Sequence, residues 1–219
     1  MARWAPERRD TMRALADELL QHYSRGRVVV GVDGTSGADA GAFADDLATE
    51  LRRAGHEVFR ASMDDFQRPR AVRDARGADS AEGLYRDGYD DAGFRRVLLG
   101  PFRLAGSTGF STALFDRERD VPFESAWETG PADAILVVDG PYLLRPELRG
   151  IWNFSVWLEA PGRAAAEPGA ASPTSETRSP RELGAEQLYL RDAAPRTAAS
   201  AIVDASDVDH PRRVFADSC

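Results

Sequence analysis

The stretch 27–43 constrains the fold of this chain more than any other part of the sequence. Its apolar run 28–32 is typical of a short, fully buried strand, and Gly34 and Gly37 follow within a turn. Apolar side chains then recur at helical spacing over 40–54. A buried strand, a glycine-containing turn and a helix in this order predict the first unit of an α/β domain.

The rest of the sequence continues the same alternation. Helices are predicted at 10–23 and 90–99, where apolar residues recur every three or four positions. Strands that alternate with helices predict a mostly parallel sheet with helices on both faces, which is a three-layer α/β fold, in a single domain spanning 1–219. Further strands are predicted at 57–62, 111–115, 134–138, 153–158 and 201–204.

One segment departs from this pattern. Residues 160–180 contain Pro161, Pro168, Pro173 and Pro180 among Ala, Ser, Gly and Thr. Prolines at this spacing prevent a long helix, so we expect a mobile loop there.

The turn after the first strand has the layout of a phosphate-binding loop but lacks its chemical groups. In the Walker A pattern G-x-x-x-x-G-K-[ST], backbone N–H groups hold phosphate, a lysine reaches the β- and γ-phosphates and a hydroxyl holds Mg²⁺. Counted from Gly34, the last three positions carry Asp39, Ala40 and Gly41. The chain contains no lysine, since its 28 positive side chains are all arginine.

A carboxylate in this loop opposes nucleotide binding. Two like unit charges about 4 Å apart repel by roughly 4 kcal/mol at an effective dielectric near 20. We therefore expect no use of ATP and no cofactor. The degenerate phosphate loop consists of Gly34, Gly37, Asp39, Ala40 and Gly41.

Charge and composition narrow the class of partner. The formal net charge of −8 argues against a nucleic-acid surface. No apolar run approaches roughly 18 residues and the N-terminus has no apolar signal segment, so we expect no membrane span and a cytoplasmic location. Cys219 and the three histidines lack metal-ligand spacing, so no metal site is expected. We expect a small-molecule substrate. The sequence leaves open whether the chain forms a homo-oligomer.

Acidic residues stand where the predicted strands end. Because the carboxyl ends of parallel strands meet at one edge of a sheet, these carboxylates are expected to lie together, and their repulsion would raise a pKa. Asp64, Asp65 and Asp139 are the predicted catalytic residues, with Asp33 and Asp116 as substrate ligands. Alternatively, each carboxylate caps a helix or binds loop amides.

Aromatic residues lie close in sequence to these acids. Phe66, Tyr85, Phe115 and Tyr142 are predicted to wall the substrate pocket. The alternative is that they belong to the hydrophobic core.

Several motifs occur together in the order of a known family. They resemble the uridine kinase-like branch of the P-loop kinases in its actinobacterial form, and this resemblance implies a P-loop kinase-like three-layer fold. The Asp-Asp-Phe and Val-Asp-Gly motifs are fairly specific as a pair. The matching segments are 31–37, 62–70, 79–90, 112–116, 137–148, 187–190 and 201–207.

The resemblance implies phosphate transfer from ATP to the 5′-hydroxyl of a nucleoside. It places Asp64 as the base at the acceptor hydroxyl, Asp139 as the metal-side carboxylate, and Tyr85, Phe115 and Asp116 in the acceptor pocket. The chain departs from the family in its phosphate loop and at 160–180, where the family has a lid helix with arginines. Both departures affect the ATP side.

Three functions fit these observations. The first is a repurposed enzyme that performs ATP-independent acid/base chemistry, such as dehydration, cyclisation or isomerisation, in the former acceptor pocket. The second is a non-catalytic pseudokinase that binds a metabolite or a protein partner. The third is a weak nucleoside or small-molecule kinase rescued by an arginine. We favour the first, because a binding module has little need for converging carboxylates.

Overall fold

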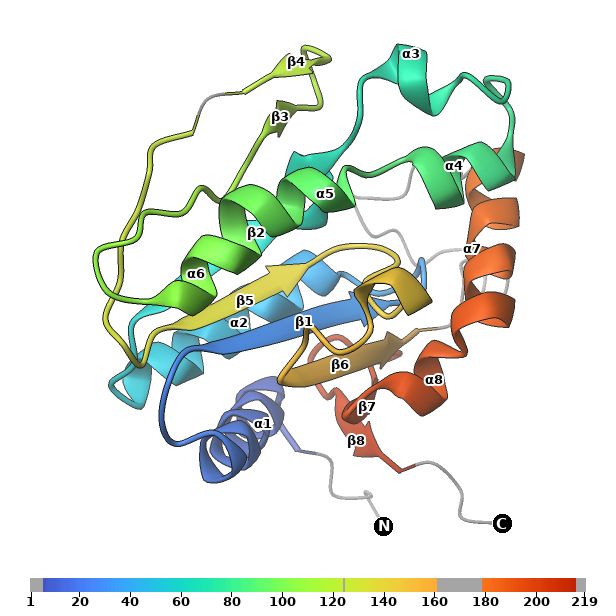
Figure 1. Cartoon of the computed structure of the whole chain (residues 1–219). Coiled ribbons are helices and arrows are strands. Elements are labelled where there is room, and N and C mark those ends of the chain that lie inside the picture. The colour runs from blue at the N-terminus through green and yellow to red at the C-terminus, as the bar shows by residue number, and fades with distance from the viewer. Residues whose placement is uncertain (1–5, 124, 161–178, 216–219) are drawn as a thin grey trace, which may run out of the picture.

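A six-stranded sheet forms the centre of the molecule (Figure 1). The computed structural model describes residues 6–123, 125–160 and 179–215. The strand order is β2-β5-β1-β6-β7-β8, in which all neighbours are parallel except β7 and β8. The strands are β1 (Val28–Gly34), β2 (Val58–Ser62), β5 (Ile135–Asp139), β6 (Phe154–Glu159), β7 (Ala201–Asp204) and β8 (Arg212–Val214).

Two helices cover one face of the sheet. In β1, Val28, Val30 and Val32 point into the same buried cluster, as alternation along a strand requires. Helices α1 (Arg8–His22) and α2 (Ala40–Arg53) bury their apolar stripes against these valines. Every third or fourth residue of α2 is fully buried, which explains why its position follows from the sequence.

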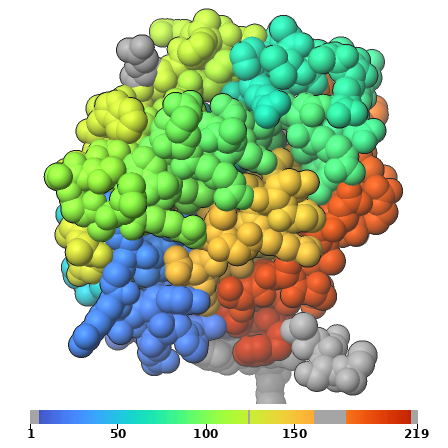
Figure 2. Space-filling view, in the orientation of Figure 1, coloured from blue at the N-terminus to red at the C-terminus, as the bar shows by residue number. Residues whose placement is uncertain are grey.

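The opposite face carries a second buried cluster under several short helices. Val29 of β1 points into this cluster, which also contains Phe94 and Tyr189. In the space-filling view, the residues of α4 to α6, segment 140–150 and helix α7 form one continuous surface (Figure 2). The elements on this side are α4 (Ala81–Asp87), α5 (Asp91–Phe94), a π-helical turn (Arg95–Leu99), α6 (Gly100–Leu104), α7 (Pro180–Ala193) and α8 (Pro195–Ala198).

The remaining short elements lie around the carboxyl end of the sheet. A 3₁₀ turn (Met63–Phe66) follows β2 directly, and α3 (Arg70–Arg73) comes next. A small antiparallel hairpin pairs β3 (Phe115–Asp116) with β4 (Val121–Pro122) outside the main sheet, and a further 3₁₀ turn spans Pro146–Leu148.

The predicted three-layer α/β fold is confirmed, with one wrong strand. Segment 111–115 is not a strand of the main sheet, and only Phe115 enters the small hairpin. Ser111 turns the chain locally, because its hydroxyl donates a hydrogen bond to the Ala113 carbonyl at 2.8 Å. Such side-chain bonds to nearby backbone compete with strand pairing.

Helix α7 is not among the helices predicted from the sequence. Its first turn has a capping box, in which the Ser179 side chain accepts from the Glu182 N–H and Glu182 accepts from the Ser179 N–H. Pro180 occupies the first turn, where its missing N–H costs nothing. Most of the expected mobile loop at 160–180 lies outside the described residues. No helix in the described part of the chain is both long and apolar enough to cross a membrane.

Candidate functional site

The loop between β1 and α2 keeps the shape of a strand–turn–helix connection. Gly34 is required at its start, because a Cβ there would lie 2.9 Å from Leu158 Cβ and 3.0 Å from Leu158 O. A turn closes the loop through the Ala38 N–H and the Thr35 carbonyl at 2.9 Å. The strand, turn and helix are therefore present, while Ala40 and Gly41 stand at the positions of the lysine and the hydroxyl.

Two carboxylates of the chain itself occupy N–H groups of this loop. Asp39 Oδ1 accepts from the Ala42 N–H at 2.9 Å and so caps α2. Glu186, on α7, places Oε1 at 2.9 Å from the Ser36 N. Internal anions thus take donors of the kind that a phosphate needs at a helix N-terminus.

The residues present do not fit a nucleotide-bound Mg²⁺. A Cβ at Gly41 would lie 3.7 Å from Asp139 Oδ2, so position 41 faces Asp139 but offers no hydroxyl. Ala40 offers no amine. Among the described residues, no group of three or more His, Cys, Asp or Glu side chains is arranged to hold a metal ion.

Asp139, at the end of β5, is bound by residues of β2. Arg60 Nη2 donates to Asp139 Oδ1 at 2.7 Å, and the Ser62 hydroxyl donates to Oδ2 at 3.2 Å. The register of the two strands explains this arrangement, because Ser62 pairs directly with Asp139. The side chain of Asp139 is 13% exposed. Its carboxylate is therefore committed to an ion pair.

Asp64 accepts hydrogen bonds from several donors after β2. Gln67 Nε2 lies 3.1 Å from Oδ1, and the Tyr89 hydroxyl lies 3.4 Å from the same oxygen. Burial raises the pKa of Tyr89 well above its usual value, so this hydroxyl stays protonated and donates. Arg117, in the β3–β4 hairpin, reaches Oδ2 at 2.8 Å.

The Asp64–Arg117 pair is open to solvent. The side chains of Asp64 and Arg117 are 30% and 56% exposed. Exposed pairs of this kind contribute about 1 kcal/mol or less. The Asp64 carboxylate is therefore partly open to solvent and held by an exposed, weakly stabilising cation.

Asp65 has a different environment from its neighbour. Burial raises the pKa of its carboxyl group, and the charges of Asp64 and Asp139 raise it further, while Arg117 lowers it. The structure thus brings together the three carboxylates that the sequence marked as catalytic, and Asp65 is the one whose proton is held more tightly than usual. Their roles stay a prediction.

Asp33 is a buried residue of the fold and not the substrate ligand expected from its strand-end position. Only 1% of its surface is exposed. Oδ1 accepts from the Gly34 N–H at 2.7 Å, and Oδ2 accepts from the N–H groups of Leu143 at 2.8 Å and Leu144 at 3.3 Å. The Tyr189 hydroxyl also donates to Oδ2. Burial raises the pKa of Asp33 to about 7, and these donors limit the rise.

Stability should depend on pH through Asp33. The folded protein keeps the Asp33 proton at pH values where the unfolded chain, with a pKa near ~3.9, has released it. This contribution to the free energy of unfolding is full below the unfolded pKa, falls by up to about 1.4 kcal/mol per pH unit, and is lost above about 7.

Urea unfolding of the wild type and Asp33→Asn between pH 5 and pH 8 measures this effect. The asparagine does not titrate, so the advantage of the wild type should shrink as the pH rises. An equal difference at every pH would show that the four donors outweigh burial and keep Asp33 ionised.

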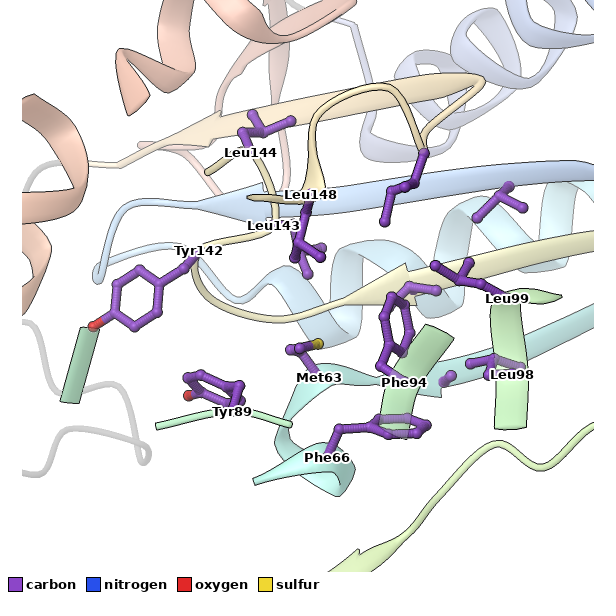
Figure 3. Packing of buried hydrophobic residues seen from close by; sticks show 14 of the residues in the cluster. Met63, Phe66, Tyr89, Phe94, Leu98, Leu99, Tyr142, Leu143, Leu144 and Leu148 are labelled. Atoms are coloured by element: carbon purple, nitrogen blue, oxygen red, sulfur yellow. The ribbon is translucent and has the colours of Figure 1, made fainter. Parts of the chain in front are cut away.

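The other predicted substrate ligands, Asp116 and the aromatic residues, make contacts that support the fold. Asp116 Oδ1 accepts from the N–H groups of Glu118 and Arg119 at 3.0 Å each and so closes the β3–β4 turn. Three rings of the predicted aromatic wall, Phe66, Tyr85 and Tyr142, belong instead to the buried cluster under the site, and Figure 3 shows Phe66 and Tyr142 there. The buried rings are Phe66, Tyr85, Phe115 and Tyr142.

Sequence reasoning missed four residues that shape the site. Arg60, Arg117, Glu186 and Tyr189 each contact an acid or the loop from a distant element. Tyr189 lies within a segment that matched the family, which was the one available signal. The shallow cavities at 55–58 and between α1 and α2 lie elsewhere and include none of these residues.

Solved structures share this fold. A possible uridine kinase from Bacillus stearothermophilus is 23% identical, with a TM-score of 0.71 over 89% of this chain and 97% of the other. A D-glycerate 3-kinase from Cryptococcus neoformans is 11% identical, with a TM-score of 0.54 over 93% of this chain and 99% of the other. No protein-family model matches the sequence. No curated protein matches it either.

The strand order, the β1–α2 loop and these similarities define the fold as that of the P-loop kinases. The fold shared with the possible uridine kinase agrees with the fold that the motif resemblance implied. Function has to be argued from the site, since one fold supports many activities.

Proposed function

We propose that this chain performs acid/base chemistry on a small molecule without using ATP. The observation that carries the proposal is the unequal environment of Asp64 and Asp65. Burial and the charge of Asp64 raise the pKa of Asp65, so it keeps its proton to a higher pH than an ordinary aspartate, whereas Asp64 accepts hydrogen bonds from Gln67, Tyr89 and Arg117. Two adjacent carboxyl groups in different environments can supply one acid and one base.

The chemistry requires proton transfer alone. In a dehydration, Asp65 would protonate the departing hydroxyl as its C–O bond breaks, and Asp64 would remove the proton whose C–H electrons form the new double bond. Cyclisations and isomerisations use the same two transfers. Each step typically contributes about 10²–10⁴ in rate when the groups lie within hydrogen-bonding distance.

The state of the phosphate loop supports independence from ATP. The Asp39 and Glu186 carboxylates occupy donors of the loop, and a polyphosphate would meet both charges. Arg60 is not available to replace the missing lysine of the phosphate loop. Its guanidinium already binds Asp45, the Val137 carbonyl and Asp139. A weak kinase is therefore disfavoured.

A non-catalytic binding protein is the second candidate. It is favoured by the Arg60–Asp139 pair, which removes from the site one of the three carboxylates that the sequence marked as catalytic. The two candidates differ in turnover: both predict ligand binding near Asp64, but only the first predicts a chemical change in the ligand.

ATP binding tests the state of the loop. We expect calorimetry to detect no ATP·Mg²⁺ binding by the wild type in the micromolar range, because lysine and hydroxyl are missing and two carboxylates face the phosphates. The variant Asp39→Gly/Ala40→Lys/Gly41→Thr should bind ATP better. Adding Glu186→Gln should improve binding further, so the triple variant is the matched control for Glu186.

A thermal-shift panel of small molecules tests the acceptor side. A ligand at about 100 times its Kd adds about 2.7 kcal/mol to the free energy of unfolding. Wild-type ATP binding with a micromolar Kd, equivalent to about −8 kcal/mol, would contradict the proposal. Conversion of a bound ligand without nucleotide would support it over the binding-protein candidate.

A further inference from the structure

The guanidinium of Arg60 lies between three elements at the carboxyl end of the sheet. Nε donates to Asp45 Oδ1 of α2 at 2.8 Å, Nη1 donates to the Val137 carbonyl of β5 at 2.7 Å, and Nη2 donates to Asp139 Oδ1 at 2.7 Å. Nη2 also lies 3.5 Å from the Gly41 carbonyl at the start of α2. The arginine side chain is 20% exposed, so this cation is mostly shielded from water.

The guanidinium of Arg60 lies between the start of α2 and the end of β5. In a working phosphate loop, these two elements would hold a divalent ion. A Cβ at position 41 would lie 3.7 Å from Asp139 Oδ2, so position 41 and the end of β5 face each other. A divalent ion on Asp139 would have to displace Nη2 from Oδ1 and then remain beside a positive charge. The hydrogen bond from Ser62 engages the second carboxylate oxygen.

We propose that Arg60 is a built-in cation that replaces the divalent ion, so that Asp139 is not a metal ligand in this chain. The guanidinium neutralises Asp45 and Asp139 and ties α2 to β2 and β5. Arginine suits this task because its planar donors stay charged at every accessible pH. The charge of Asp139 also raises the pKa of Asp65, but this proposal concerns metal binding at Asp139 and its test needs no turnover.

Removal of the guanidinium should uncover a site for a hard cation. Arg60→Met keeps much of the length of the side chain but leaves the carboxylates of Asp45 and Asp139 and the Val137 and Gly41 carbonyls without their donor, with the Ser62 hydroxyl beside Asp139. Oxygen ligands of this kind suit Mg²⁺ and Mn²⁺. The chain as it stands should lack this affinity.

Titration with Mn²⁺, followed by electron paramagnetic resonance and by thermal shift, tests the proposal. We expect no Asp139-dependent binding by the wild type, and at least tenfold tighter binding by Arg60→Met that Asp139→Asn abolishes in the double variant. Arg60→Lys keeps a positive charge and should resemble the wild type, so it is the matched control.

Two results would overturn the role of Arg60. One is Mn²⁺ binding by the wild type that Asp139→Asn removes, which would make Asp139 a metal ligand despite the ion pair. The other is a folded Arg60→Met variant that gains no Mn²⁺ affinity. If Arg60→Met does not fold, the comparison of the wild type with Asp139→Asn still decides, because Asp139-dependent binding overturns the proposal and its absence supports it.

Discussion

Replacing Asp33 with alanine should lower the free energy of unfolding by about 3–5 kcal/mol, one of the largest losses expected from a single substitution in this chain. The change would leave the Gly34 N–H, the Leu143 N–H and the Tyr189 hydroxyl without their acceptor. A buried donor without a partner costs about 1–3 kcal/mol. Urea unfolding at pH 6, followed by circular dichroism, measures the loss.

Two variants separate this network from a general effect of losing a carboxylate. Asp17→Ala removes an exposed acid from α1 and should change the free energy of unfolding by less than about 0.5 kcal/mol. Tyr189→Phe removes one donor and should cost about 1 kcal/mol. A loss below about 1 kcal/mol for Asp33→Ala would mean that water or a local rearrangement replaces the acceptor.

The central sheet was predictable because its strands are short apolar runs. Strands β1, β5 and β6 are buried on both faces, so their sequences are continuously apolar and stand out from the helices between them. The same criterion failed at 111–115. There apolar and hydroxyl residues mix, and the chain crosses the end of the sheet without joining it.

The composition of the acidic cluster was also predictable, whereas the partners of the acids were not. Strand ends of a parallel sheet must meet at one edge, which brought Asp64, Asp65 and Asp139 together. Partner choice depends on contacts between distant segments. Glu186 lies 150 residues from Ser36, and Tyr189 lies 156 residues from Asp33. No local pattern encodes such pairs.

The contacts of Asp39 and Glu186 show what the N–H groups at the phosphate loop bind in the folded chain. The sequence shows that the loop lacks the lysine and the hydroxyl that would bind a nucleotide. From the sequence alone, the backbone N–H groups of the loop would still be free to bind phosphate. The structure shows that carboxylates bind some of these N–H groups, one from the cap of α2 and one from α7. Helix α7 is itself held by the ion pairs Arg181–Asp74 and Arg86–Asp192. The contact between Glu186 and the loop is therefore held in place by the packing of α7.

Replacing Asp65 with asparagine should lower the turnover of the substrate by about 10²–10⁴ while leaving its binding nearly unchanged. Asparagine keeps the size of the side chain but cannot deliver a proton. Because burial and Asp64 raise the pKa of Asp65, wild-type activity should persist above the usual titration range of an aspartate and fall at higher pH as Asp65 ionises. Steady-state kinetics across pH, with the ligand found by thermal shift, measures both effects.

Matched variants distinguish the acid from its neighbour and from a binding role. Asp64→Asn should lower turnover by a similar factor, because the base that accepts the substrate proton is lost. The double variant should cost little more than either single change, since residues that act in one step are not additive. Asp79→Asn, at an exposed position between α3 and α4, should retain full activity. Full turnover by Asp65→Asn would remove Asp65 from the mechanism, whereas a ligand that binds near Asp64 and is never converted would establish the chain as a binding protein.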